Sequence, residues 1–160
     1  MRADDLGAVM ALADQLHPAC PEHADVLAER HRLCPEGCLI LPDAQDMAGG
    51  YALSHPWRMA APPALDTYLH HLPAQADCWY LHDIALLPTL RGRGATHAAL
   101  QIMTRLARAR APAWLALVAT EGAEPLWAHL GFAPTPGIPP AITATYGADA
   151  RPMRRALAHI

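Results

Sequence analysis

The stretch "YLHDIALLPTLRGRGATHAAL", residues 80–100, decides the interpretation of this chain. Its first half is an apolar run typical of a buried strand, and that run ends at Pro88. An Arg-Gly-Arg-Gly turn follows at 91–94, and small residues at helical spacing begin at Ala95. A helix entered through such a turn exposes unbonded backbone N–H groups at its start. These groups carry positive potential and suit a phosphate.

The turn itself has two explanations. Gly92 and Gly94 let the backbone approach a ligand closely, and Arg91 and Arg93 can add charge-assisted hydrogen bonds, so we expect a pyrophosphate cradle. An ordinary strand–helix turn with two exposed arginines would look the same. The turn is not a Walker loop, because the Gly-Lys-Ser/Thr ending is missing, and it does not fit Gly-x-Gly-x-x-Gly.

Composition narrows the class of protein. A length of 160 residues fits one domain, and 52% hydrophobic with 17% charged residues indicates a globular chain. The net charge of −3 argues against a nucleic-acid partner, and all twelve Lys/Arg positions are arginine. No apolar run is long enough to span a membrane. The four cysteines show no disulfide framework, so we predict a soluble cytoplasmic protein with free thiols.

The flanking patterns predict a mixed α/β domain over residues 1–160, built around one central sheet. Pro56 lies in "HPW" (55–57) and should end the strand before it, because proline cannot donate to a ladder. The predicted helices are 5–16, 21–33, a short one within 64–71, 95–111 and 122–130, and the predicted strands are 38–41, 47–54, 78–87, 114–118, 132–134 and 153–157.

Two motifs resemble the GNAT superfamily of N-acetyltransferases. "LLPTLRGRGAT" (86–96) is similar to that family's acyl-CoA loop, Arg/Gln-x-x-Gly-x-Gly/Ala after a strand ending in Val-x-Pro. Arg91 and Gly94 match, whereas Thr96 stands where Gly or Ala is usual. "AEPLWAHLGF" (123–132) resembles the second motif, Ala-x-x-Leu-Tyr-x-x-Leu-Gly-Phe. The resemblance covers nearly the whole chain, but the family's first strand would precede Arg2 and is expected to be short or absent.

The resemblance implies a GNAT fold, a mostly antiparallel sheet that is splayed between its fourth and fifth strands and flanked by helices. Acetyl-CoA would enter the gap as cosubstrate, without a metal, and a primary amine would attack its thioester directly. The pantetheine would pair with Ile84, Ala85 and Leu86, and the Leu86 N–H would polarise the thioester carbonyl. The pyrophosphate would meet Arg91 and the loop residues Gly92, Arg93, Gly94, Ala95, Thr96 and His97.

An ammonium group must lose a proton before it attacks, and His82 is the expected base. Its reference pKa of about 6.5 suits that role. Alternation along a strand would put Tyr80, His82, Ile84 and Leu86 on one face, with Asp83 on the other. The stretch "YLHDIAL" also resembles arylalkylamine N-acetyltransferases, with Tyr80 where they carry a second histidine. A purely structural His82 that hydrogen-bonds within the sheet is the alternative.

The second motif departs from the family at Trp127, where a tyrosine often protonates the departing thiolate. Indole cannot do so, although a thiol with a pKa of about 8.5 is already a fair leaving group, and Tyr80, His129 or water could substitute as the acid. We expect Trp127 to pack against the pantetheine or the core. The change also fits a non-catalytic module that only binds or senses acyl-CoA.

Three further hypotheses concern other parts of the chain. Ser54, His55 and Trp57 could line the acceptor pocket, or could form a structural break with Trp57 covering the core. Cys34 and Cys38 with a nearby histidine do not match a recognised zinc spacing. A nucleotide-binding protein outside the family would show no preference for CoA over ATP. The acceptor, a small-molecule amine or an amine of a peptide or protein, cannot be chosen from the sequence, and a homodimer is possible.

Overall fold

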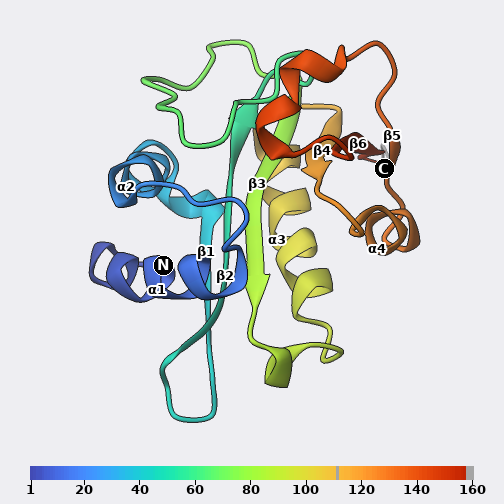
Figure 1. Ribbon diagram of the computed structural model, residues 1–160. Helices are drawn as coiled ribbons and strands as arrows, with labels where there is room; N and C mark the ends of the chain where they lie inside the picture. Colours follow the sequence, from blue (N-terminus) through green and yellow to red (C-terminus); the bar gives the residue numbers. More distant parts are fainter. Residues whose placement is uncertain (111, 158–160) are drawn as a thin grey trace.

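Six strands form one sheet in the part of the chain that the computed structural model describes, residues 1–110 and 112–157. The order across the sheet is β1-β2-β3-β4-β6-β5, and every neighbouring pair is antiparallel except β3 and β4 (Figure 1). The strands are β1 (Cys38–Pro42), β2 (Ala48–Trp57), β3 (Cys78–Leu86), β4 (Trp114–Ala119), β5 (Ala133–Pro134) and β6 (Arg151–Ala156). This arrangement confirms the expected mixed, mostly antiparallel α/β fold.

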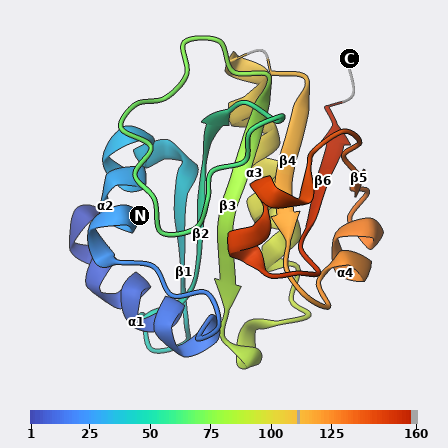
Figure 2. The same ribbon diagram turned by 45° about the horizontal axis from the view of Figure 1, so that its top comes forward.

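Helices cover both faces of the sheet (Figures 1 and 2). On one face, α1 (Leu6–Leu16) and α2 (Ala24–Leu33) enclose a core that includes Leu27 and Leu53. On the other, α3 (Ala95–Arg110) and α4 (Glu124–His129) share a core that includes Trp79 and Met103. Short 3₁₀ turns occupy Ala3–Asp5, Pro35–Gly37, Pro88–Leu90, Pro140–Ile142 and Ala144–Tyr146. No helix in the described ranges is long and apolar enough to cross a membrane.

The two parallel strands separate soon after they meet. Cys78–Leu81 of β3 pairs with Trp114–Leu117 of β4, but beyond Leu81 the strand β3 continues to Leu86 beside β2 alone. Figure 1 shows β3 running on past the end of β4. This is the expected splay. It falls between the third and fourth strands here, because the residues before Cys38 form helices and turns rather than a strand.

The predicted break in β2 at residues 55–57 is wrong. The strand continues to Trp57, and Pro56 stands opposite Trp79 of β3. The pairing of β1 with β2 reaches only Leu53, so Pro56 has a neighbouring strand on one side alone. A proline is tolerated where one side of a strand needs no donor.

The predicted short helix within 64–71 is also wrong, because residues 58–77 form an irregular segment with turns. Asp66 and His70 adopt left-handed φ angles of 55° and 63°, which interrupt a helix. The buried Glu29 carboxylate of α2 accepts the N–H groups of Leu69 (2.6 Å) and His70 (3.0 Å). The Glu29 side chain therefore takes the place of the backbone hydrogen-bond acceptors that a helix would have supplied.

We expect Glu29→Ala to loosen this segment. The change leaves the N–H groups of Leu69 and His70 without their acceptor, which should lower the free energy of unfolding by about 1–3 kcal/mol. Limited proteolysis within 58–77 should accelerate, and urea denaturation would measure the loss. The control is Asp25→Ala, which changes an exposed acid on the same helix. We expect it to lower the free energy of unfolding by at most about 1 kcal/mol. Equal stability and equal cleavage of the two variants would contradict the anchoring role.

Candidate active site

A β-bulge at His82 determines which side chains of β3 face the same way. Leu53 stands opposite Asp83 and Ser54 opposite Leu81, so His82 is the extra residue. A bulge interrupts the alternation of a strand. His82 and Asp83 consequently both contact the α1–α2 side, through Glu22 and His17, whereas Ile84 packs against the α3 core. We expected Ile84 and Leu86 on the same face as His82, and this is wrong. We also expected Asp83 on the opposite face from His82, and this is wrong too.

The backbone of β3 presents an unpaired edge to the gap. The Leu87 N–H donates to Gly49 O of the β2 side at 2.8 Å. Because antiparallel strands alternate the direction of their backbone groups, the N–H and C=O of Leu86 and Ile84 point away from β2. Ala85 turns its backbone toward β2, so only two of the three residues expected to pair with pantetheine offer backbone groups there. Arg91 Nε donates to Leu86 O at 3.2 Å from the same side.

A cavity of about 730 Å³ adjoins this gap. Its walls come from the α1–α2 connection (16–22), the bulge of β3 (81–84), the end of β4 with the start of α4 (117–127), and the segment 144–149. Trp127, which is buried against Phe132 at a ring distance of 5.5 Å, contributes one wall. Trp127 therefore belongs to the core and to the cavity at once.

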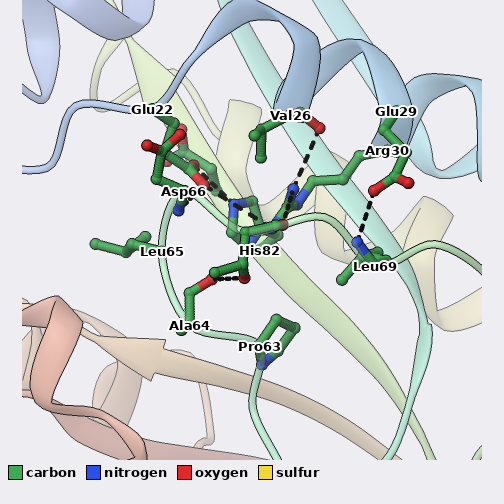
Figure 3. A network of polar contacts seen from close by, with 12 residues as sticks. Glu22, Val26, Glu29, Arg30, Pro63, Ala64, Leu65, Asp66, Leu69 and His82 are labelled. Carbon is green, nitrogen blue, oxygen red and sulfur yellow. Dashed lines mark hydrogen bonds and ion pairs between the residues drawn. The ribbon is translucent and has the colours of Figure 1, made fainter.

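Glu22 and His82 form a buried pair beside this cavity (Figure 3). His82 Nε2 lies 2.8 Å from Glu22 Oε1, and because it faces a carboxylate it carries the hydrogen. The His82 side chain is 0% exposed and that of Glu22 is 7% exposed. Nδ1 of His82 is buried without a hydrogen-bond partner among the described residues. The carboxylate, rather than the imidazole, is therefore the group of this pair that reaches the cavity.

The second oxygen of Glu22 ties the pair to its surroundings. Oε2 accepts the Asp66 N–H at 2.8 Å and lies 3.8 Å from the guanidinium of Arg30. Burial alone would raise the pKa of Glu22, but the hydrogen bond and charge of His82 and the charge of Arg30 outweigh it, so the pKa is lowered. Glu22 is thus held in its ionised form at neutral pH.

A second titratable cluster lies on the same side of the bulge. His17, at the end of α1, donates from Nε2 toward Asp83 Oδ1 at 3.1 Å and Ile84 O at 3.3 Å. Tyr51 donates its hydroxyl to the other oxygen of Asp83. The hydrogen bond with Asp83 raises the pKa of His17 despite partial burial. Burial opposes ionisation of Asp83, yet the hydrogen bond and charge of His17 lower its pKa.

Tyr80 is buried and reaches the cavity only through Tyr146. The two hydroxyls lie 3.2 Å apart, and Tyr146 donates to Pro63 O at 2.7 Å, so Tyr80 donates to Tyr146. Tyr146 lines the cavity, and burial raises its pKa to about 12. Burial also raises the pKa of Tyr80 well above its usual value.

The turn before α3 is left-handed at both of its glycines. Gly92 and Gly94 adopt φ angles of 72° and 78°, a left-handed region that favours glycine. A methyl group at either position would contact nothing within 4 Å, so conformation rather than crowding explains the glycines. The 16-residue helix α3 begins directly afterwards at Ala95, and Arg91, Arg93 and His97 are exposed. Figure 1 places this turn beyond the end of β3.

Ser54, His55 and Trp57 lie outside the lining of the cavity. Ser54 Oγ donates to Gly37 O at 2.7 Å and accepts from Trp79 at 2.9 Å. His55 is buried, which lowers its pKa to about 3, and Trp57 donates to Ala61 O at 2.8 Å. All four cysteines are free thiols. Among the described residues no three His, Cys, Asp or Glu side chains gather as metal ligands would.

The comparisons with known proteins agree with this geometry. The family model described as "Acetyltransferase (GNAT) family" matches residues 8–132, and the chain belongs to this family. Among curated proteins, none matches by sequence.

Solved structures show the same fold at low sequence identity. The GphF GNAT-like decarboxylase in complex with isobutyryl-CoA superposes with a TM-score of 0.77 at 16% identity, over 99% of this chain and 97% of that one. The ribosomal-protein-S18-alanine N-acetyltransferase of Escherichia coli gives 0.66 at 20% identity, over 100% and 92%. Arabidopsis thaliana Naa50 in complex with the bisubstrate analogue CoA-Ac-MVNAL gives 0.70 at 14% identity, over 97% and 94%.

The raised pKa of His17 predicts a pH dependence of stability. The stabilisation from its bond to Asp83 is fully present below the unfolded-state pKa of about 6.5 and is lost as the pH rises through the raised folded value. Relative to His17→Gln, the unmodified chain should therefore lose stability between mildly acidic and mildly alkaline pH. Urea denaturation across that range would measure the difference, with exposed His129→Gln as control. A constant difference between the chain and His17→Gln would refute the coupling.

Proposed function

We propose that this protein transfers an acetyl or other short acyl group from acetyl-CoA to a primary amine, by direct attack in a ternary complex. The observation that carries the proposal is the edge of β3 that β4 leaves unpaired beyond Leu81, where residues 81–84 line a cavity that also contains the buried carboxylate of Glu22. When bound, acetyl-CoA supplies the activated acyl group. A donor at the edge and an acceptor of protons in the cavity are the two groups that aminolysis needs.

The residues present suit an acyl-CoA. The turn at Gly92 and Gly94 and the first N–H groups of α3 would hold the diphosphate, with the exposed arginines of the loop nearby. Ile84 and Leu86 would pair with the pantetheine arm, and Trp127 would form a wall beside it. The Leu86 N–H would stabilise the negative charge that develops on the thioester oxygen.

Glu22 is the group we assign to receive the proton of the acceptor. Its carboxylate lines the cavity and is held ionised, while the covered imidazole of His82 orients it and stabilises its charge. This replaces direct proton transfer to His82, whose side chain has no exposed surface. Glu22 thereby takes the catalytic role, and His82 acts as a positioning residue. We assign protonation of the departing thiolate to Tyr146, which lines the cavity and is hydrogen-bonded to Tyr80.

The central experiment measures CoA release from acetyl-CoA with a panel of amines, alongside equilibrium binding of CoA and ATP. Amine-dependent turnover is the expected result. Tight CoA binding without turnover on any amine would instead favour the acyl-CoA-sensing module that Trp127 motivates. Equal affinity for ATP and CoA would favour a nucleotide-binding protein.

The chain offers a matched pair of glycines for testing the loop. Gly94 and Gly137 both have φ of 78°, and both face open space. Substitution by alanine imposes similar backbone strain at the two positions. We expect Gly94→Ala to raise the Kd for CoA at least about tenfold and Gly137→Ala to leave it unchanged. Isothermal titration would measure both, and equal effects would remove the loop from the CoA site.

Glu22→Gln should lower kcat/KM at pH 7 by roughly 10²-fold or more, because the amide cannot accept the proton. The Kd for CoA should stay within about twofold. His82→Gln should produce a smaller loss together with a shift of the pH profile, since it changes the environment of Glu22. The control is Asp25→Asn, an exposed acid outside the cavity. Full activity in Glu22→Gln would refute the assignment.

A further inference from the structure

Carboxylates outnumber basic groups in the lining of the cavity. Four carboxylates line it, those of Glu22, Asp83, Glu121 and Asp149, and no arginine does. The chain contains no lysine that could contribute a cation. Two histidines belong to the residues around the cavity, His17 and the covered His82, and each already faces a carboxylate.

Two of these carboxylates have no partner among the residues that the structure describes. Glu121 and Asp149 are exposed and make no hydrogen bond or ion pair with the residues that the structure describes. They lie close to one another along the fold, because the β4–β6 ladder ends with Ala119 opposite Arg151. Glu121 follows that last pair by two residues, and Asp149 precedes it by two. Both therefore stand where the ladder opens into the cavity.

Three arginines on elements around the cavity make hydrogen bonds within the chain. Arg30 is 1% exposed, lies behind Glu22, and donates to the carbonyl groups of Val26 and Thr67. Arg91 donates to Leu86 O, and Arg151 donates to Ala150 O without lining the cavity. A carboxylate or phosphate on the acceptor would thus meet unpaired carboxylates, and each basic group in the lining already faces a carboxylate of the chain.

From this one-sided lining we infer the class of acceptor: a cationic primary amine with an apolar body and no carboxylate or phosphate group. Its ammonium meets Glu22, and its body contacts apolar walls that include Leu16, Pro18 and Leu65. Glu121 and Asp149 attract the cation and repel anionic analogues. Free amino acids are excluded, whereas an amine of similar shape without the carboxylate is accepted. This inference rests on the proposed function.

Three acceptors of equal side chain test it: leucine, leucinamide and 3-methylbutylamine. They differ chiefly in whether a carboxylate, a neutral amide or a hydrogen accompanies the amine. The three amines differ in basicity, so kcat/KM is calculated from the concentration of the unprotonated amine rather than from the total concentration. We expect leucine to fall at least about tenfold below both other compounds. Equal or better turnover of leucine would overturn the inference and leave the proposed function standing.

In the double variant Glu121→Gln/Asp149→Asn, the ratio of kcat/KM for leucinamide to kcat/KM for leucine should fall by at least about threefold. The control, Asp4→Asn/Asp25→Asn, removes the same net charge at exposed positions outside the cavity and should leave the preference unchanged. An unchanged preference in the first variant, or an equal change in the control, would overturn the assignment to these walls.

Binding separates this inference from the proposed function. Equilibrium titration of the three compounds into the CoA-loaded chain should give the same ranking without any turnover. Ranked binding with no acetylation of any amine would refute the proposed function while supporting the acceptor class. Binding of leucine as tight as that of leucinamide would overturn the acceptor class, whatever the turnover.

Discussion

The parallel pairing of β3 with β4 ends after Leu81 and Leu117, and the rest of the site depends on that separation. A strand that loses its neighbour exposes backbone N–H and C=O groups that must find other partners. In this chain Arg91 and His17 each occupy one of these carbonyl groups, while the Leu86 N–H faces the gap. The cavity and the unpaired edge are thus two aspects of one interruption in the sheet.

Burying charge beside this gap is costly unless each group is paired. The structure meets that requirement with a cluster in which Glu22 is shared between His82, Arg30 and the backbone of Asp66. Arg30 keeps unpartnered nitrogen atoms within the described part of the chain, so its pairing is incomplete. Buried polar groups without partners are uncommon, and here they concentrate around the pair to which we assign proton transfer.

Much of the fold follows from local patterns that sequence can show. The apolar run before Pro88 and the glycines at 92 and 94 predict the strand and the turn at the head of α3. The splayed sheet was implied only by the resemblance of this loop and of the motif around Trp127 to the GNAT family. The bulge at His82 could not be predicted, since it depends on the register that β2 imposes across the ladder. The place of Glu22 and His17 in the site could not be predicted from the sequence for a related reason. Both lie in the connection between α1 and α2, and only tertiary packing brings that connection to β3.

The divided role of Glu22 has a consequence for how the protein should lose activity. One of its oxygens holds His82, and the other holds the segment 58–77 through Asp66. Release of that segment would therefore disturb the proposed catalytic carboxylate while the strands remain folded. Heat or denaturant should therefore inactivate this molecule in a local transition that comes before global unfolding, because the proposed catalytic carboxylate depends on the irregular segment 58–77 for one of its hydrogen bonds.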